Sequence, residues 1–236
     1  MRLAESESDD DFVVPQNAVI AERLLFRLPR RGSSPSLMSG FQELARAIAP
    51  HVNRTAIMRR SPEARLARRL FDFDTVVKPL LGSAAEEFYI SIQKQWEWNS
   101  RYWEQRALLL GDANLDMALQ YARHAVALEK HPFPLTTLGK LLLKQMEFGN
   151  NRDRAFAEAF KHLSEAIYIE EHRKRTSVHP FATLLSGAAR YLELGGELTF
   201  EQGERIDSCA DAAERRYPSD AVIAAAIRRL YEADER

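Results

Sequence analysis

The chain has 236 residues, 45% of them hydrophobic, and a formal net charge of −1, so it can build one elongated domain or two small ones. The near-zero charge excludes a global basic field for nucleic acid, and no apolar run reaches the roughly 18 residues that a membrane span needs. The acidic start is unlike a signal peptide and the single cysteine, Cys209, cannot form an internal disulfide, so we expect a cytoplasmic protein. Glycines and prolines are few and cluster between helical patterns, and no alternating segment has the length of a strand. The sequence therefore predicts an all-α fold.

The N-terminal part of the chain predicts a small helical subdomain over residues 13–97. It follows residues 1–12, which are acidic, nearly without apolar partners, and expected to be disordered. Apolar periodicity predicts helices over residues 17–28 and 36–49, each followed by a proline that ends it.

A clear helix start follows at Ser61-Pro62-Glu63, because serine caps a helix, proline fits its first position, and an acid complements its dipole. This helix should extend to about Phe71. A short helix near residues 75–81 ends at Gly82, and Ser83 opens a longer helix that continues to Trp96.

Residues 101–130 read as a helical hairpin of the tetratricopeptide type. The first helix should cover residues 101–110, with Gly111-Asp112 as the turn, and Trp103 fills the wider end of the pair. In the second helix Ala118, Ala122 and Ala125 follow one another at spacings of four and three, so they share one face and allow close packing. Such a hairpin needs stacked neighbours to bury its apolar face, which favours a binding surface over a catalytic pocket.

Two further hairpins and a closing helix are predicted downstream. The second begins at Pro134, with Gly139 in its first helix and Ala166 in its second. It exceeds the roughly 34-residue period, so it carries either an insertion or long helices. The third pairs residues 181–194 with residues 199–216, which include Ala213, and Ser219 or Asp220 caps a last amphipathic helix. The expected architecture is an α-solenoid of tetratricopeptide-like hairpins over residues 98–236, preceded by the small helical subdomain.

A cluster of arginines is the first candidate site. Six lie close together and are opposed only by Glu63: Arg54, Arg59, Arg60, Arg65, Arg68 and Arg69. On a helix the last three share a face. They could contact phosphates, of nucleic acid or of a nucleotide bound by an attached ATPase domain, or simply form a solvated face. We favour the solvated face, because no aromatic residues interleave with the arginines to stack on bases.

Other candidate groups favour structural roles. Trp96 and Trp103 are two helical turns apart and should share a buried face, which leaves Trp98 as the better candidate for an exposed partner contact. Cys209 could in principle pair with a histidine as a nucleophile, but a small buried side chain is the simpler interpretation. The six histidines show no H-E-x-x-H pattern, so we expect no metal, no cofactor and no catalytic residues.

Two short stretches carry a family resemblance: Ala18-Val19-Ile20-Ala21-Glu22, and Tyr102-Trp103-Glu104-Gln105-Arg106-Ala107. They resemble motifs in the C-terminal region of bacterial STAND-type NTPases, the switch proteins of antiphage defence, over roughly residues 13–170. The resemblance implies a helical region that precedes degenerate tetratricopeptide repeats. In that family the repeats sense a phage protein or contact a neighbouring protomer. The chain departs from the family in having no G-x-x-x-x-G-K-[ST] phosphate loop.

The leading hypothesis is therefore a protein-binding sensor or oligomerisation region of a STAND-like defence NTPase that lacks the ATPase core. Its partner would be a phage protein, its own NTPase domain or a neighbouring protomer. A stand-alone adaptor or scaffold is the alternative, and a nucleic-acid-binding helical protein is less favoured. An enzyme has no constellation of residues to support it, and no membrane role is expected.

Overall fold

A computed structural model describes residues 3–4, 14–15, 34–52, 61–149, 151–172 and 177–234. The fold is all-helical, as the sequence predicts. Besides helices, the described residues contain one antiparallel pair of two-residue strands, β1 (Leu3–Ala4) and β2 (Val14–Pro15). The rest of the acidic segment 1–12 and the helix predicted over residues 17–28 lie outside the described residues. The chain divides into two compact units, Met1–Leu109 and Leu110–Arg236, here called unit 1 and unit 2.

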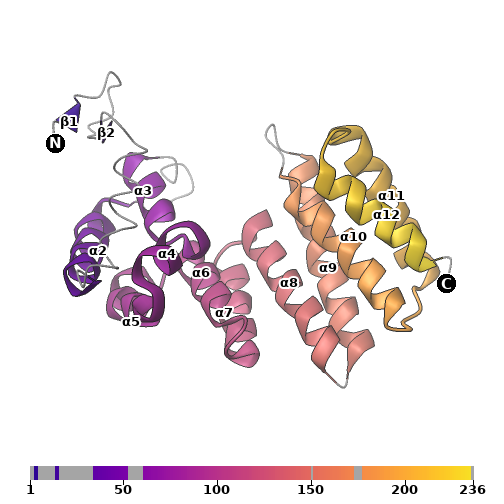
Figure 1. Cartoon of the computed structure of the whole chain (residues 1–236), viewed down its shortest axis with the longest axis horizontal. Helices are drawn as coiled ribbons and strands as arrows, with labels where there is room; N and C mark the ends of the chain where they lie inside the picture. Colours follow the sequence, from indigo (N-terminus) through magenta and orange to yellow (C-terminus); the bar gives the residue numbers. More distant parts are fainter. Residues whose placement is uncertain are drawn as a thin grey trace. The chain divides into compact units, whose positions relative to one another are not determined.

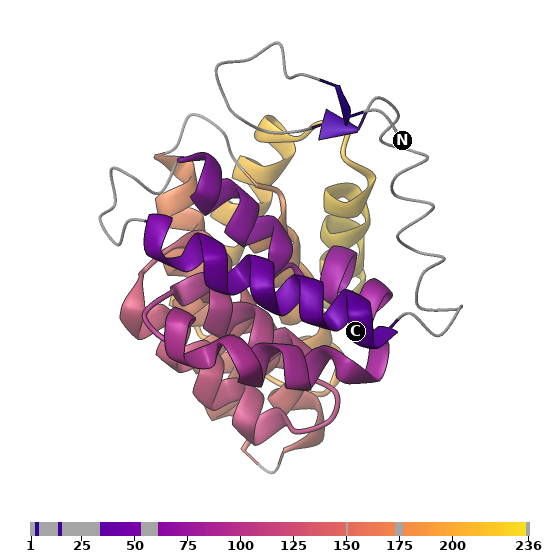
Figure 2. The same cartoon turned by 90° about the vertical axis from the view of Figure 1, so that its left-hand side faces the viewer.

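Unit 1 is built from short and irregular helical elements. Helix α2 packs against α3, α4 and α5, and it crosses the view in indigo in Figure 2. The elements are α2 (Ser34–Ile48), a 3₁₀ turn (Ala49–His51), α3 (Pro62–Leu70), a π-helical turn (Phe73–Val77), α4 (Lys78–Leu81), a 3₁₀ turn (Gly82–Ala84), α5 (Ala85–Trp96) and α6 (Ser100–Leu110).

The helix boundaries of unit 1 follow local chemistry. The Ser61 hydroxyl accepts a hydrogen bond from the Ala64 amide at 3.2 Å, which confirms the predicted cap of α3. Asp72 caps the π-helical turn by accepting from the Thr75 amide at 2.9 Å. Gly82 ends α4 with a φ of 53°, a value that side chains rarely tolerate, so glycine is required there.

Helix α6 belongs to unit 1, although the sequence placed the start of the repeat region at residue 98. The Tyr102 hydroxyl donates to the Tyr89 carbonyl at 2.8 Å, and its ring packs edge-on against Phe71. The Gln105 side chain accepts from the Phe73 amide at 2.7 Å. These contacts anchor α6 in the core of unit 1. The first predicted hairpin therefore spans the boundary between the two units.

Unit 2 consists of longer helices joined by short loops (Figure 1). Each predicted helix is present within a few residues of its expected bounds. The second hairpin has no insertion; its extra length goes into two long helices. The helices are α7 (Leu115–Leu128), α8 (Pro132–Phe148), α9 (Arg152–Glu171), α10 (His179–Glu193), α11 (Phe200–Arg216) and α12 (Ala221–Asp234).

Two glycines allow close helix packing in unit 2. Helix α8 contacts α7, α9 and α10, and α10 in turn contacts α9, α11 and α12. A Cβ added to Gly139 of α8 would lie 2.5 Å from Cγ of Leu163 in α9, and one added to Gly187 of α10 would collide with Leu143 of α8. The segments before these glycines are related, because His131-Pro132-Phe133 and His179-Pro180-Phe181 precede Gly139 and Gly187 at the same spacing. The helices α8 and α10 thus occupy corresponding positions in two sequence-related hairpins.

Candidate functional site

The residues predicted for helix packing are all buried. Ala118, Ala122, Ala125, Ala166 and Ala213 are 0% exposed, and Trp103 is 8% exposed. Gly139 is buried at its close approach to Leu163. The small-residue stripe of α7 therefore faces the interior, as its spacing predicts.

The arginines Arg65, Arg68 and Arg69 lie on α3 and are exposed. Arg68 and Arg69 occupy the last turn of α3, where a positive charge complements the helix dipole. Arg54, Arg59 and Arg60 lie outside the described residues. An exposed position near the end of a helix is compatible with both phosphate binding and a solvated face. Our preference for the solvated face therefore stays a prediction.

The three tryptophans form part of the core of unit 1. Trp96 is fully buried and its indole nitrogen donates to the Ala45 carbonyl at 3.0 Å, while that of Trp103 donates to the Glu97 carbonyl at 2.7 Å. Trp98, the candidate for an exposed contact, is half-buried. Its ring stacks on Trp96 with centroids 5.8 Å apart, and its indole nitrogen donates to the Gln95 carbonyl at 2.8 Å. Part of the Trp98 ring is therefore used in packing, which reduces the surface that it offers to a partner.

Cys209 lies on α11 and is 2% exposed. Burial raises the pKa of its thiol to about 12, so the thiol is protonated at neutral pH. A protonated, buried thiol is a poor nucleophile, and this supports the interpretation of Cys209 as a small core residue.

Ion pairs connect helices of unit 2 that are next but one along the chain. Arg123 of α7 binds Glu158 of α9 at 3.0 Å, and Lys130, in the loop after α7, binds Glu165 of α9 at 2.9 Å. A second series runs across α8, α10 and α12, and its members are Glu147, Arg190, Glu193 and Arg229. Hydrogen bonds from Arg229 and Arg190 lower the pKa of Glu193 to about 2, although its partial burial opposes the shift. Glu193 is therefore the central acid of this second series.

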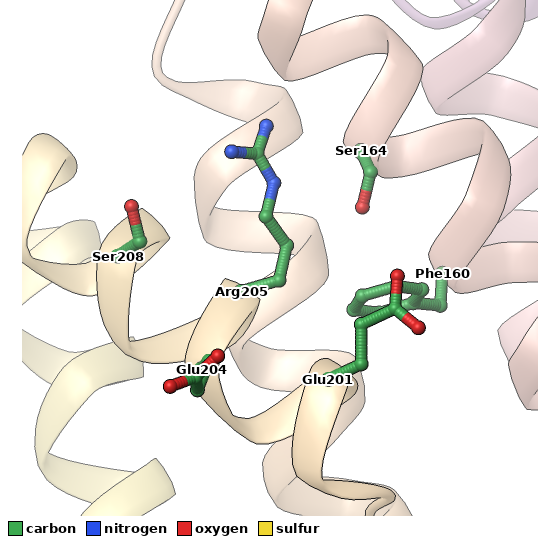
Figure 3. A pocket seen from close by; sticks show the side chains of 6 residues that line it. All are labelled: Phe160, Ser164, Glu201, Glu204, Arg205 and Ser208. Carbon is green, nitrogen blue, oxygen red and sulfur yellow. The ribbon is translucent and has the colours of Figure 1, made fainter.

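A pocket of about 440 Å³ lies between α9 and α11, within unit 2 (Figure 3). Arg205 extends along the pocket, and its guanidinium group points away from the Glu201 carboxylate. The Ser164 hydroxyl points into the same space; its oxygen is buried and has no hydrogen-bond partner among the described residues. Six side chains line the pocket: Phe160 and Ser164 from α9, and Glu201, Glu204, Arg205 and Ser208 from α11.

The sequence analysis did not identify this pocket. The usable signal was the spacing of Glu201, Glu204, Arg205 and Ser208, which puts these polar residues on one side of α11. Spacing within one helix, however, does not reveal which helix lies opposite. The contribution of Phe160 and Ser164 therefore required the structure.

Within the described ranges, no group of three or more histidine, cysteine, aspartate or glutamate side chains is arranged to hold a metal ion. Over the same part of the chain, no helix combines the length and the apolar character needed to cross a membrane.

Comparisons with known proteins found no relative. No protein-family model matches the sequence, and neither a curated protein nor a solved structure matches it. Functional interpretation therefore depends on the residues and contacts described above.

Proposed function

We propose that unit 2 is a protein-binding module of stacked helical hairpins. The observation that carries this proposal is that helices next but one along the chain lie against each other. Contacts join α8 to α10 and α10 to α12, and the ion pair of Arg123 with Glu158 joins α7 to α9. Stacked hairpins produce this order of neighbours, and proteins built in this way use their extended surfaces to bind other proteins.

The recurrence of one sequence pattern supports the same proposal. His-Pro-Phe followed at a fixed spacing by a glycine occurs at the start of α8 and again at the start of α10. Each glycine permits close packing against a leucine of a neighbouring helix. A local sequence unit that recurs at the start of two helices is typical of repeat architectures.

The finer proposal is a sensor or oligomerisation region of a STAND-like antiphage defence NTPase. Its support is the sequence resemblance, in which Tyr102 and Trp103 open the related stretch. The partner would then be a phage protein, the NTPase domain or a neighbouring protomer. A stand-alone adaptor or scaffold with the same hairpins is the alternative.

Exposed aromatic side chains are the candidate contact points for a protein partner. Phe148 at the end of α8 is 75% exposed, and Phe200 at the start of α11 is 81% exposed. Large aromatic residues contribute much of the binding energy in protein interfaces.

Site-specific photocross-linking tests the proposal. A photoreactive phenylalanine analogue is placed at Phe148 or Phe200 in the full chain, which is expressed in its native host with and without phage. A cross-linked band that forms only on infection supports a phage-protein partner, and a homotypic band supports a neighbouring protomer. A partner captured equally in both conditions favours the adaptor. The matched control is Ile90 of unit 1, 54% exposed. Cross-links at neither position of unit 2, or equal cross-linking from Ile90, would count against the proposal.

A further inference from the structure

The pocket between α9 and α11 has charges of both signs on separate parts of its lining. Arg205 supplies a half-buried guanidinium group, and its side chain points away from the Glu201 carboxylate (Figure 3). Glu201 and Glu204 supply two exposed carboxylates. With two negative groups and one positive group, the lining favours a ligand that carries two positive groups and one negative group.

An uncharged group adds to this selectivity. Phe160 lines the same pocket, so a cation bound by Glu201 or Glu204 can also contact an aromatic face. Guanidinium binds carboxylate in a paired geometry, so Arg205 can hold the carboxylate of such a ligand.

We propose that this pocket binds arginine or lysine bearing a free α-carboxylate. The carboxylate of the ligand binds Arg205, while its cationic side chain is held by the carboxylates of the pocket and contacts Phe160. The volume of about 440 Å³ falls in the range of small-molecule sites. The same chemistry is available from a free basic amino acid and from the C-terminal residue of a peptide. The charge complement favours the free amino acid, because its α-ammonium group supplies the second positive charge.

The pocket lies within the proposed protein-binding module, but neither Phe148 nor Phe200 lines it, so the two proposals are tested by different residues. Loss of cross-linking at Phe148 and Phe200 would leave the site intact, and failure to bind a basic amino acid would leave the protein-binding proposal standing.

Isothermal titration of the full chain tests the site. L-Arginine should bind saturably with a Kd below about 1 mM. Agmatine, which lacks the carboxylate, and L-norleucine, which lacks the side-chain cation, should each bind at least about tenfold more weakly. Absence of saturation up to about 10 mM by both L-arginine and a tetrapeptide ending in arginine, or agmatine binding as tightly as arginine, would overturn the assignment.

Variants identify the residues responsible. Arg205→Gln and Glu201→Gln should each weaken arginine binding by about tenfold or more, because each removes a charge-assisted contact. Arg215→Gln and Glu214→Gln on the same helix are the matched controls, since both side chains are exposed and neither lines the pocket. Far-UV circular dichroism verifies that each variant is folded. Binding that survives both pocket substitutions would place arginine elsewhere and contradict the assignment.

Two more ligands distinguish the sources of the carboxylate. Nα-Acetyl-arginine and a tetrapeptide ending in arginine both lack the free α-ammonium group on the terminal residue. Tighter binding of free arginine assigns the site to the amino acid, and tighter binding of the tetrapeptide assigns it to a peptide C-terminus. Both results support recognition of a basic residue with a free α-carboxylate, provided that Arg205→Gln weakens binding of the ligand that binds more tightly.

Discussion

Units 1 and 2 are both helical but are held together in different ways. The elements of unit 1 are short, and their free carbonyls accept hydrogen bonds from aromatic side chains of other elements. The Tyr89 hydroxyl donates to the carbonyl of Phe71, the residue that caps the C-terminus of α3, at 2.6 Å. Trp96 donates to Ala45 in the last turn of α2 at 3.0 Å. Helix ends leave such carbonyls without partners within the helix, and buried ones must be satisfied.

In unit 2, close packing of the helices replaces these hydrogen bonds from aromatic side chains to backbone carbonyls. Gly139 and Gly187 bring helix backbones against leucines, and fully buried alanines line the packed faces. Ion pairs at the surface then connect next-but-one helices. The comparison indicates that the long helices of unit 2 pack against one another through small residues. The short, irregular elements of unit 1 are instead held by large aromatic side chains whose polar end donates a hydrogen bond.

The largest expected effect is in unit 1. Trp96→Ala should lower the free energy of unfolding by about 3–5 kcal/mol, because it empties a fully buried site and leaves the Ala45 carbonyl without its donor. Trp96→Phe keeps most of the packing and should lose about 1 kcal/mol for the hydrogen bond. Urea unfolding followed by circular dichroism measures both. If Trp96→Phe were as stable as the wild type, the hydrogen bond would not stabilise unit 1.

Unit 2 should respond most strongly to added volume. Ala122→Leu, in the small-residue stripe of α7, should cost about 1–3 kcal/mol by overpacking. Gly139→Ala should also be destabilising, by about 1–2 kcal/mol, since the collision with Leu163 outweighs the gain in helix propensity.

The matched control for Gly139→Ala is Gly203→Ala in α11, where an added Cβ meets nothing within 4 Å. Because the added methyl group meets no neighbour and alanine favours the helix more than glycine does, Gly203→Ala should stabilise the protein by up to about 1 kcal/mol. The same urea unfolding measures all three variants. Equal effects of the two glycine substitutions would show that close packing is not the reason for glycine in α8.

Local signals made most of the helices of unit 2 predictable. Gly195-Gly196 separates α10 from α11, and Asp220 caps α12 by accepting from the Val222 amide at 2.9 Å. The assignment of α6 to unit 1 was not predictable from periodicity, because large aromatic residues such as Tyr102 and Trp103 are compatible with the core of either unit. The sequence also did not show that Phe160 of α9 and Arg205 of α11 line the same pocket, because this depends on how the two helices are aligned with each other. The related starts of α8 and α10 were readable in the sequence, but at a spacing longer than the usual repeat period.

A smaller effect is expected from the ion pairs of unit 2. Glu193→Gln should cost on the order of 1 kcal/mol at neutral pH, since surface pairs contribute little individually and Glu193 contacts two arginines. The folded-state pKa of Glu193 is lowered from 4.5 to about 2, so its contribution is complete above pH 4.5 and is lost as the pH falls toward 2. The stability difference between wild type and variant should shrink over that interval. Glu232→Gln, on the exposed face of α12, is the control for removing the charge of an exposed glutamate.

The smallest expected effect on stability concerns the arginines on α3 of unit 1. Arg65→Glu/Arg69→Glu should change the free energy of unfolding by no more than about 0.5 kcal/mol per site, because both side chains are exposed. The informative measurement is a salt titration of a fluorescent oligonucleotide. We expect weak binding at low salt that disappears at physiological salt, because the nearby aromatic residues Phe71 and Phe73 are buried and cannot stack on bases. The same charge reversal on unit 2, Arg215→Glu/Arg228→Glu, is the control for a general charge effect. Tight binding at physiological salt that only the α3 double variant abolishes would contradict the solvated-face hypothesis and assign nucleic-acid contact to unit 1.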